Sequence, residues 1–64
     1  MNMIGKRVAL RPHTDLWMQG ERFGTIRQLN RSRAEPGVVR FGVVLDKSGR
    51  LAKLHQQHVE VLWD

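Results

Sequence analysis

Residues 38–54, VVRFGVVLDKSGRLAKL, decide the fold of this 64-residue chain. The first half of this stretch is rich in valine and contains Phe41, and β-branched and aromatic side chains favour strands. Asp46-Lys47-Ser48-Gly49 then interrupts the apolar pattern with an aspartate that can bond nearby backbone amides and a glycine that tolerates positive φ. Residues 50–54 return as a second strand. We therefore predict a β-hairpin with a four-residue connection.

The alternation within the hairpin predicts which face is buried, because successive strand side chains point to opposite sides. The face expected to be buried carries Val39, Phe41, Val43 and Leu45. Gly42 lies in the middle of the strand, and we expect it to mark a bulge or a bend.

Three shorter strands are expected outside the hairpin, at residues 6–10 (KRVAL), 22–29 (RFGTIRQL) and 59–62 (VEVL). In the second of these, Phe23 and Ile26 are the expected core anchors. A polar segment, HQQH, separates the hairpin from the last strand and is long enough for one tight turn.

Two segments connect these strands. Residues 14–20 (TDLWMQG) are too short for an independent helix, but Thr14 or Asp15 can cap a single turn and Gly20 can end it. Trp17 in this segment has two interpretations, a lid on the small core or an exposed stacking platform, and the need for buried area favours the lid. Residues 30–37 (NRSRAEPG) are predicted to form a basic, exposed loop.

The strand order resembles that of SH3-like barrels, the group that includes KOW, Tudor and chromo-barrel modules. The resemblance rests on residues 6–10, on the glycine-punctuated segment 20–26, on the hairpin at 38–54 and on the strand, one-turn helix, strand pattern of 54–62. It implies an all-β fold: a small five-stranded antiparallel SH3-like barrel with a one-turn helix before the last strand. We expect residues 1–64 to form one such domain.

The layout is also similar to that of the plasmid-encoded type II dihydrofolate reductases, small SH3-like barrels that assemble into tetramers. Residues 5–8 (GKRV), Trp17 ahead of Gly20 and the histidine-containing segment carry this likeness. The family's Val-Gln-Ile-Tyr active-site segment has no match, since residues 51–54 (LAKL) stand in its place. Function must be carried by a site rather than by a fold, so the reductase is the third functional alternative.

Charge is the main functional signal of the composition. Eleven Lys and Arg against six Asp and Glu give a net charge of +5, which favours a polyanionic partner such as nucleic acid, or an acidic protein. The other interpretation is a solvated face that only maintains solubility. We predict a nucleic-acid-binding module that contacts the phosphate backbone. The residues predicted to bind nucleic acid are Arg31, Arg33, Arg40, Lys47, Arg50 and Lys53.

The second functional alternative is a protein-interaction or self-assembling module. A 64-residue chain without cysteine has no disulfides to supplement its small core, and self-association is a common substitute. The apolar residues expected at such an interface are Trp17, Val38, Val44 and Trp63.

No catalytic, metal or cofactor pattern is present, so we expect neither an enzyme nor a cofactor. The carboxylates are scattered singly, and His13, His55 and His58 lack the cysteine or carboxylate spacing of a metal site. The few aromatic residues weaken base stacking and a methyl-lysine cage alike. Without an apolar run long enough for a membrane span or a signal peptide, the expected location is cytoplasmic.

Overall fold

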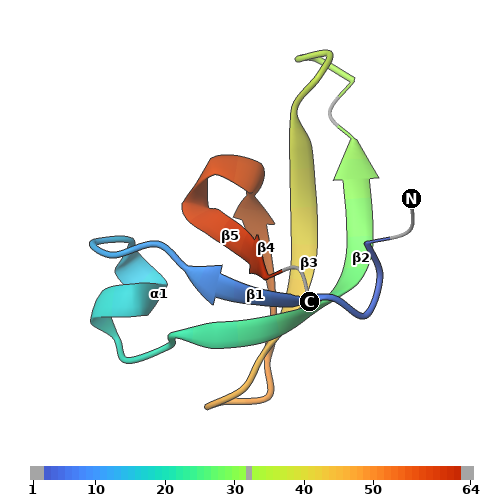
Figure 1. Cartoon of the computed structure of the whole chain (residues 1–64). Coiled ribbons are helices and arrows are strands. Elements are labelled where there is room, and N and C mark those ends of the chain that lie inside the picture. Colours follow the sequence, from blue (N-terminus) through green and yellow to red (C-terminus); the bar gives the residue numbers. More distant parts are fainter. Residues whose placement is uncertain (1–2, 32, 63–64) are drawn as a thin grey trace.

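Five strands form one antiparallel sheet in the computed structural model, which describes residues 3–31 and 33–62 (Figure 1). The sheet order is β4-β3-β2-β1-β5, and the predicted fold class is confirmed as a small five-stranded antiparallel all-β chain with a one-turn helix before its last strand. The elements are β1 (Arg7–Leu10), α1 (Asp15–Met18), β2 (Phe23–Arg31), β3 (Val39–Leu45), β4 (Leu51–His55), the 3-10 helix η1 (Gln56–His58) and β5 (Val59–Leu62). Among the described residues no ladder joins β4 to β5, so the pairing is that of an open, strongly bent sheet.

The β3–β4 hairpin turns at the predicted residues 46–49, and β4 begins at Leu51, one residue later than expected. The Leu45 N–H donates to the Arg50 carbonyl at 2.9 Å, and the Gly49 N–H donates to the Leu45 carbonyl at 2.8 Å. Gly49 adopts φ 74°, a left-handed conformation that costs glycine little. Gly49 thus acts as predicted, whereas the Asp46 carboxylate accepts hydrogen bonds from Arg7 of β1.

The core lies on the inner face of the sheet. Its buried members are Val8, Leu10, Ile26, Phe41, Val43, Leu45 and Val59, with Leu16 and Trp17 of α1 packed against them. The predicted alternation along β3 is confirmed, since Phe41, Val43 and Leu45 are buried and Val39 is half-buried. Trp17 is half-buried and packs against the core. This agrees with the interpretation of Trp17 as a lid on the core and not with that of an exposed stacking platform.

Phe23 is not a core anchor, contrary to the sequence-based expectation, because its side chain remains 47% exposed. The register pairs Val8 with Gly24 and Ile26 with Val43, so these positions of β2 face inward. A strand that alternates regularly cannot bury positions 23 and 26 together, since they have opposite parity. Phe23 therefore lies on the outer face of the sheet.

The bulge lies in β2 rather than in β3. The register with β3 steps from Ile26–Val43 to Gln28–Gly42, which leaves Arg27 as the extra residue. β2 bends sharply in Figure 1, its first half running along β1 and its second half along β3. Gly42, on the opposite strand, leaves room for the Gln28 side chain, because a Cβ at position 42 would lie 2.9 Å from the Cβ of Gln28.

The end of α1 is fixed by a Schellman motif. The Gly20 N–H donates to the Trp17 carbonyl at 3.0 Å and the Glu21 N–H to the Leu16 carbonyl at 2.9 Å, with Gly20 at φ 99°. Gly20 thus ends the helix as predicted. Thr14 is the N-cap residue, but its hydroxyl donates to the Arg11 carbonyl at 2.9 Å instead of capping the helix.

We predict that Gly24→Ala destabilises the protein by about 1–3 kcal/mol, because the added methyl meets packed atoms. A Cβ at position 24 would overlap Val43 Cγ1 and lie 2.8 Å from the Val44 carbonyl oxygen. Urea unfolding measures the cost. In the Gly24→Ala, Val43→Ala double variant part of the clash is removed, so the two losses should sum to more than the observed loss. Strict additivity would show that the two side chains do not meet.

Candidate nucleic-acid interface

The six predicted nucleic-acid-binding residues are spread along the β3–β4 hairpin. Arg31, Arg33 and Arg40 lie at the open end, Lys53 lies at mid-length opposite Gly42, and Lys47 and Arg50 lie at the closing turn. β3 runs for seven residues between these ends, which corresponds to about 20 Å at roughly 3.3 Å per residue. The structure therefore does not gather all six cations at one place.

Two of the predicted residues share the outer face of the sheet with polar neighbours. Cross-strand pairing aligns Asn30, Arg40 and His55 in one row and Gln28, Gly42 and Lys53 in the next. Neighbouring strands lie about 4.8 Å apart, so Arg40 and Lys53 are diagonal neighbours on adjacent strands. Both side chains are exposed.

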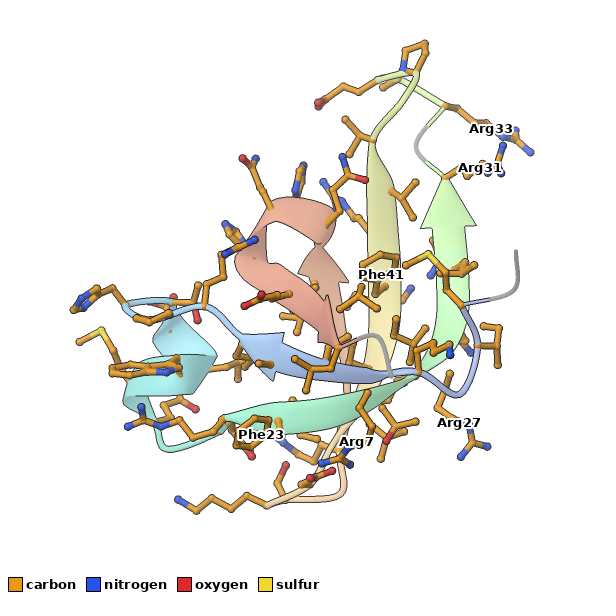
Figure 2. All side chains as sticks on the ribbon, viewed as in Figure 1. Arg7, Phe23, Arg27, Arg31, Arg33 and Phe41 are labelled. Atoms are coloured by element: carbon orange, nitrogen blue, oxygen red, sulfur yellow. The ribbon has the colours of Figure 1, made fainter. Side chains whose placement is uncertain are left out.

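The bulge adds Arg27 to this surface. By its alternation with buried Ile26, Arg27 lies on the outer face, and the register step places Gln28 on that face as well. Arg27 projects away from the bend of β2 in Figure 2. We call the two rows together with Arg27 the basic face. The sequence showed Arg27 only as one of many cations, since no local signal located the bulge.

The basic face is electrostatically uncompensated. No carboxylate of the described residues belongs to its two rows, because the acidic residues lie in α1, the loops, the hairpin turn and β5. Among those same residues, Arg27, Arg40 and Lys53 have no ion pair or hydrogen bond to their side chains. Their positive charges are therefore available to an external anion.

Arg31 and Arg33 lie at the open end of the hairpin but outside the two rows, because Arg31 pairs with Val39 and therefore has the parity of the inner face. Arg31 is the last residue of β2. It therefore lies in a strand, whereas the sequence predicts it in the loop of residues 30–37. Both arginines are exposed, and Figure 2 shows them side by side beside the β2–β3 loop. A shallow hollow of about 450 Å³ is lined by Arg31 and by residues 36–39.

The turn cations have a different environment. The Lys47 ammonium donates to the Gln19 carbonyl at 3.3 Å, at the C-terminal end of α1. Cations are favoured at helix C-termini, so Lys47 tethers the hairpin turn to α1. Arg50 lies directly after the turn and is exposed.

Of the four expected interface residues, the three that the structure describes do not form one surface. Trp17 packs on the core, and the Arg22 guanidinium covers its ring at 3.6 Å from the centroid. Val38 and Val44 are half-buried and lie near opposite ends of β3. Trp63 lies outside the described residues.

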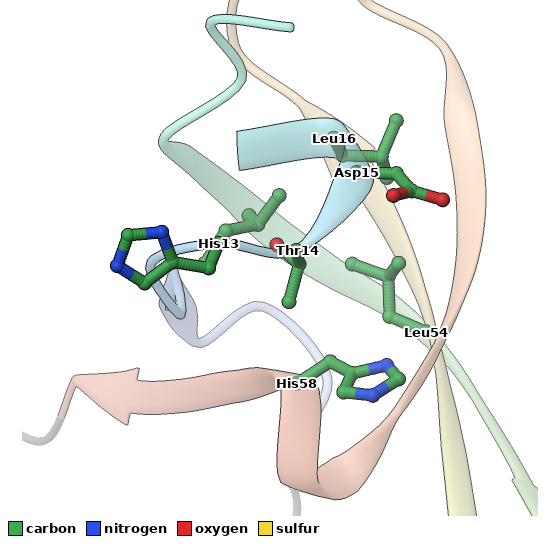
Figure 3. A pocket seen from close by; sticks show the side chains of 7 residues that line it. His13, Thr14, Asp15, Leu16, Leu54 and His58 are labelled. Atoms are coloured by element: carbon green, nitrogen blue, oxygen red, sulfur yellow. The ribbon is translucent and has the colours of Figure 1, made fainter. Parts of the chain in front are cut away.

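A cleft of about 440 Å³ opens beside α1 (Figure 3). Leu10, Leu16 and Leu54 give it apolar walls, and polar side chains line the rest: His13, Thr14, Asp15 and His58. His55 lies outside it and caps η1, its Nδ1 accepting from the Gln57 N–H at 3.1 Å. Within residues 3–31 and 33–62, no three His, Asp or Glu side chains are grouped to hold a metal ion.

The only carboxylate buried among the described residues is Glu21, which is 5% exposed and lines neither the cleft nor the hollow. Its burial was not expected from the sequence, where it follows Gly20 in a polar context.

No helix in the described part of the chain is long and apolar enough to cross a membrane.

Comparison with known proteins gives no match: no protein-family model, no curated protein and no solved structure matches the chain. Function must therefore be inferred from the residues and geometry of the chain itself.

An ion pair on the outer face, away from the basic face, predicts a pH effect on stability. Arg7 donates to both carboxylate oxygens of Asp46, with Nη1 to Oδ1 at 2.8 Å. The hydrogen bond from Arg7, aided by its charge, lowers the pKa of Asp46 below its ordinary value. A lowered pKa contributes stability that is present above the unfolded-state pKa of about 3.9 and is lost as pH falls through the folded-state pKa.

We therefore expect Asp46→Asn to be less stable than the wild type above about pH 5, with the difference in unfolding free energy shrinking below about pH 4. Denaturant unfolding across this range measures it. Glu60→Gln is the matched control, since Glu60 is exposed and has no ion pair in the described part of the chain. A wild-type advantage over Asp46→Asn that persists undiminished in acid would contradict the prediction.

Proposed function

We propose that this protein is a small nucleic-acid-binding module that holds the phosphate backbone on its basic face. The observation that carries the proposal is the group of unpaired cations, Arg27, Arg40 and Lys53, on a surface whose rows contain no carboxylate. The sheet order and the one-turn helix before β5 support an SH3-like type of fold, which is the scaffold we propose.

The contact chemistry follows from the residue types. Arginine presents a planar fork that binds phosphate oxygens through two parallel hydrogen bonds, whereas lysine acts as a point charge. Gln28 and Asn30 lie in the same rows and can donate side-chain amide hydrogens to phosphate or sugar oxygens. Arg31 and Arg33 add exposed positive charge beside the β2–β3 loop, outside the two rows.

Base recognition has little support on this surface. The two rows contain no Phe, Trp or Tyr, and Arg22 covers the Trp17 ring. Without aromatic platforms or clustered base-reading side chains, binding is expected to depend on charge rather than on nucleotide sequence.

We predict that oligonucleotide affinity falls steeply with salt, with a log–log slope of roughly −3 to −5 for four or five neutralised phosphates. Fluorescence anisotropy at about 50 and 200 mM salt, with single- and double-stranded oligonucleotides, measures the slope. Removing two contacts through Arg40→Gln with Lys53→Gln should reduce its magnitude by about 2. Arg31→Gln with Arg33→Gln should act in the same direction.

The matched control is Lys47→Gln with Arg50→Gln, which removes the same two charges at the far end of the hairpin. Circular dichroism establishes that each variant is folded. If the three double variants lost affinity equally, only net charge would matter and the basic face would not be a site. Absence of binding by the wild type at the lower salt would reject the function altogether.

A further inference from the structure

The outer face of the sheet carries an apolar surface next to the Arg7–Asp46 ion pair. Thr25 of β2, Val44 of β3 and Leu51 of β4 are direct cross-strand neighbours, and Phe23 lies two residues before Thr25 on the same face. Phe23 is 47% exposed and Leu51 50% exposed, while Val44 is half-buried between them. We call Phe23, Thr25, Val44 and Leu51 the outer apolar patch.

This patch is continuous rather than scattered. Single exposed apolar side chains are normal on protein surfaces, but here three come from adjacent strands of one sheet. The inner face of the same strands already supplies the core, and no helix or strand of the described residues forms a second layer over the outer face. A partner that covers this patch would remove large apolar side chains from water.

The patch also differs in charge from the rest of the surface. Arg7 donates to Asp46 and, at 3.3 Å, to the Thr25 hydroxyl, so a cation and an anion lie together at its border. Figure 2 shows Arg7 and Phe23 near each other along the first half of β2. The local charges cancel, whereas the whole chain carries +5 and the basic face repels like-charged molecules.

We propose that the outer apolar patch is where a second copy of this chain docks, giving a two-fold symmetric dimer. In a two-fold symmetric contact, each pair of residues that meet across the interface occurs twice. A border with one cation and one anion can therefore pair with the same border of a second copy. Arg7 of each copy can then face Asp46 of the other, while Phe23 and Leu51 pack between them. The net positive charge disfavours any copy-to-copy contact made through the basic face.

The dimer adds to nucleic-acid binding without depending on it. The patch lies beside the basic face on the same side of β2, β3 and β4, so the dimer carries two basic faces. Two linked faces bind one polyanion with higher apparent affinity than either alone when both can reach it.

The two interactions respond differently to salt. Salt screens both the repulsion between two chains of net charge +5 and the Arg7–Asp46 attraction between copies, while apolar burial persists, so self-association should depend only weakly on salt. Oligonucleotide binding should weaken over the same range. Failure of one proposal is therefore distinguishable from failure of the other.

Analytical ultracentrifugation of the full chain without nucleic acid, from low to high micromolar concentration, tests the dimer. We expect a concentration-dependent shift from monomer to dimer mass. Phe23→Thr with Leu51→Thr keeps strand-favouring residues while it removes the apolar area, and it should raise the dimer dissociation constant about tenfold or more. Met18→Gln, at a 68% exposed methionine outside the patch, is the matched control and should leave the constant unchanged.

Thr25→Arg is a second variant, which keeps the apolar side chains but places an unpaired charge within the patch. It should also abolish the dimer, and circular dichroism with thermal melting verifies that both patch variants fold. A wild-type protein that is monomeric at every concentration would overturn the proposal. So would a dimer that survives both patch variants, because its interface would then lie elsewhere.

Discussion

The bulge at Arg27 bends β2 and thereby sets the register of the strands on both sides of it. One nine-residue strand pairs with β1 at its first half and with β3 along its length, and a regular strand cannot turn from one direction to the other. The extra residue, Arg27, absorbs the turn, and Gly42 leaves room for Gln28 on the opposite strand. The same step changes which positions face outward, so Ile26 is buried while Gln28 joins the surface.

This parity change also explains why the outer face has two regions of different chemistry. Before the bulge, outward positions of β2 are Phe23 and Thr25, which adjoin Val44 and Leu51. After it, outward positions are Gln28 and Asn30, which adjoin Arg40 and Lys53. The Arg7–Asp46 pair neutralises charge at the first region, whereas no carboxylate belongs to the second. A neutral surface for another copy and a cationic surface for a polyanion can thus exist on one small sheet.

The small size of the chain bears on both the nucleic-acid-binding proposal and the dimer proposal. A 64-residue chain buries only about 60% of the surface that it exposes when unfolded, and the residues that the structure describes contribute seven buried apolar side chains to its core. Pairing two copies adds buried area without a larger chain. It also brings together two weak electrostatic sites, which is how small modules gain affinity for extended polyanions.

Local residue patterns were enough to predict the five strands, the hairpin turn, the end of α1 at Gly20 and the inward face of β3, because turn chemistry and a period of two are local properties. Phe23 also follows this period of two. The expectation that it joins Ile26 in the core was wrong because residues 23 and 26, three positions apart, face opposite sides of a regular strand. Only the tertiary structure decided which cations lie together. Arg40 and Lys53 became diagonal neighbours through cross-strand register, whereas Lys47 and Arg50 lie at the closing turn of the hairpin. Register in β2 depends on a bulge whose position is fixed by packing between strands far apart in the chain, and no local pattern of residues records it.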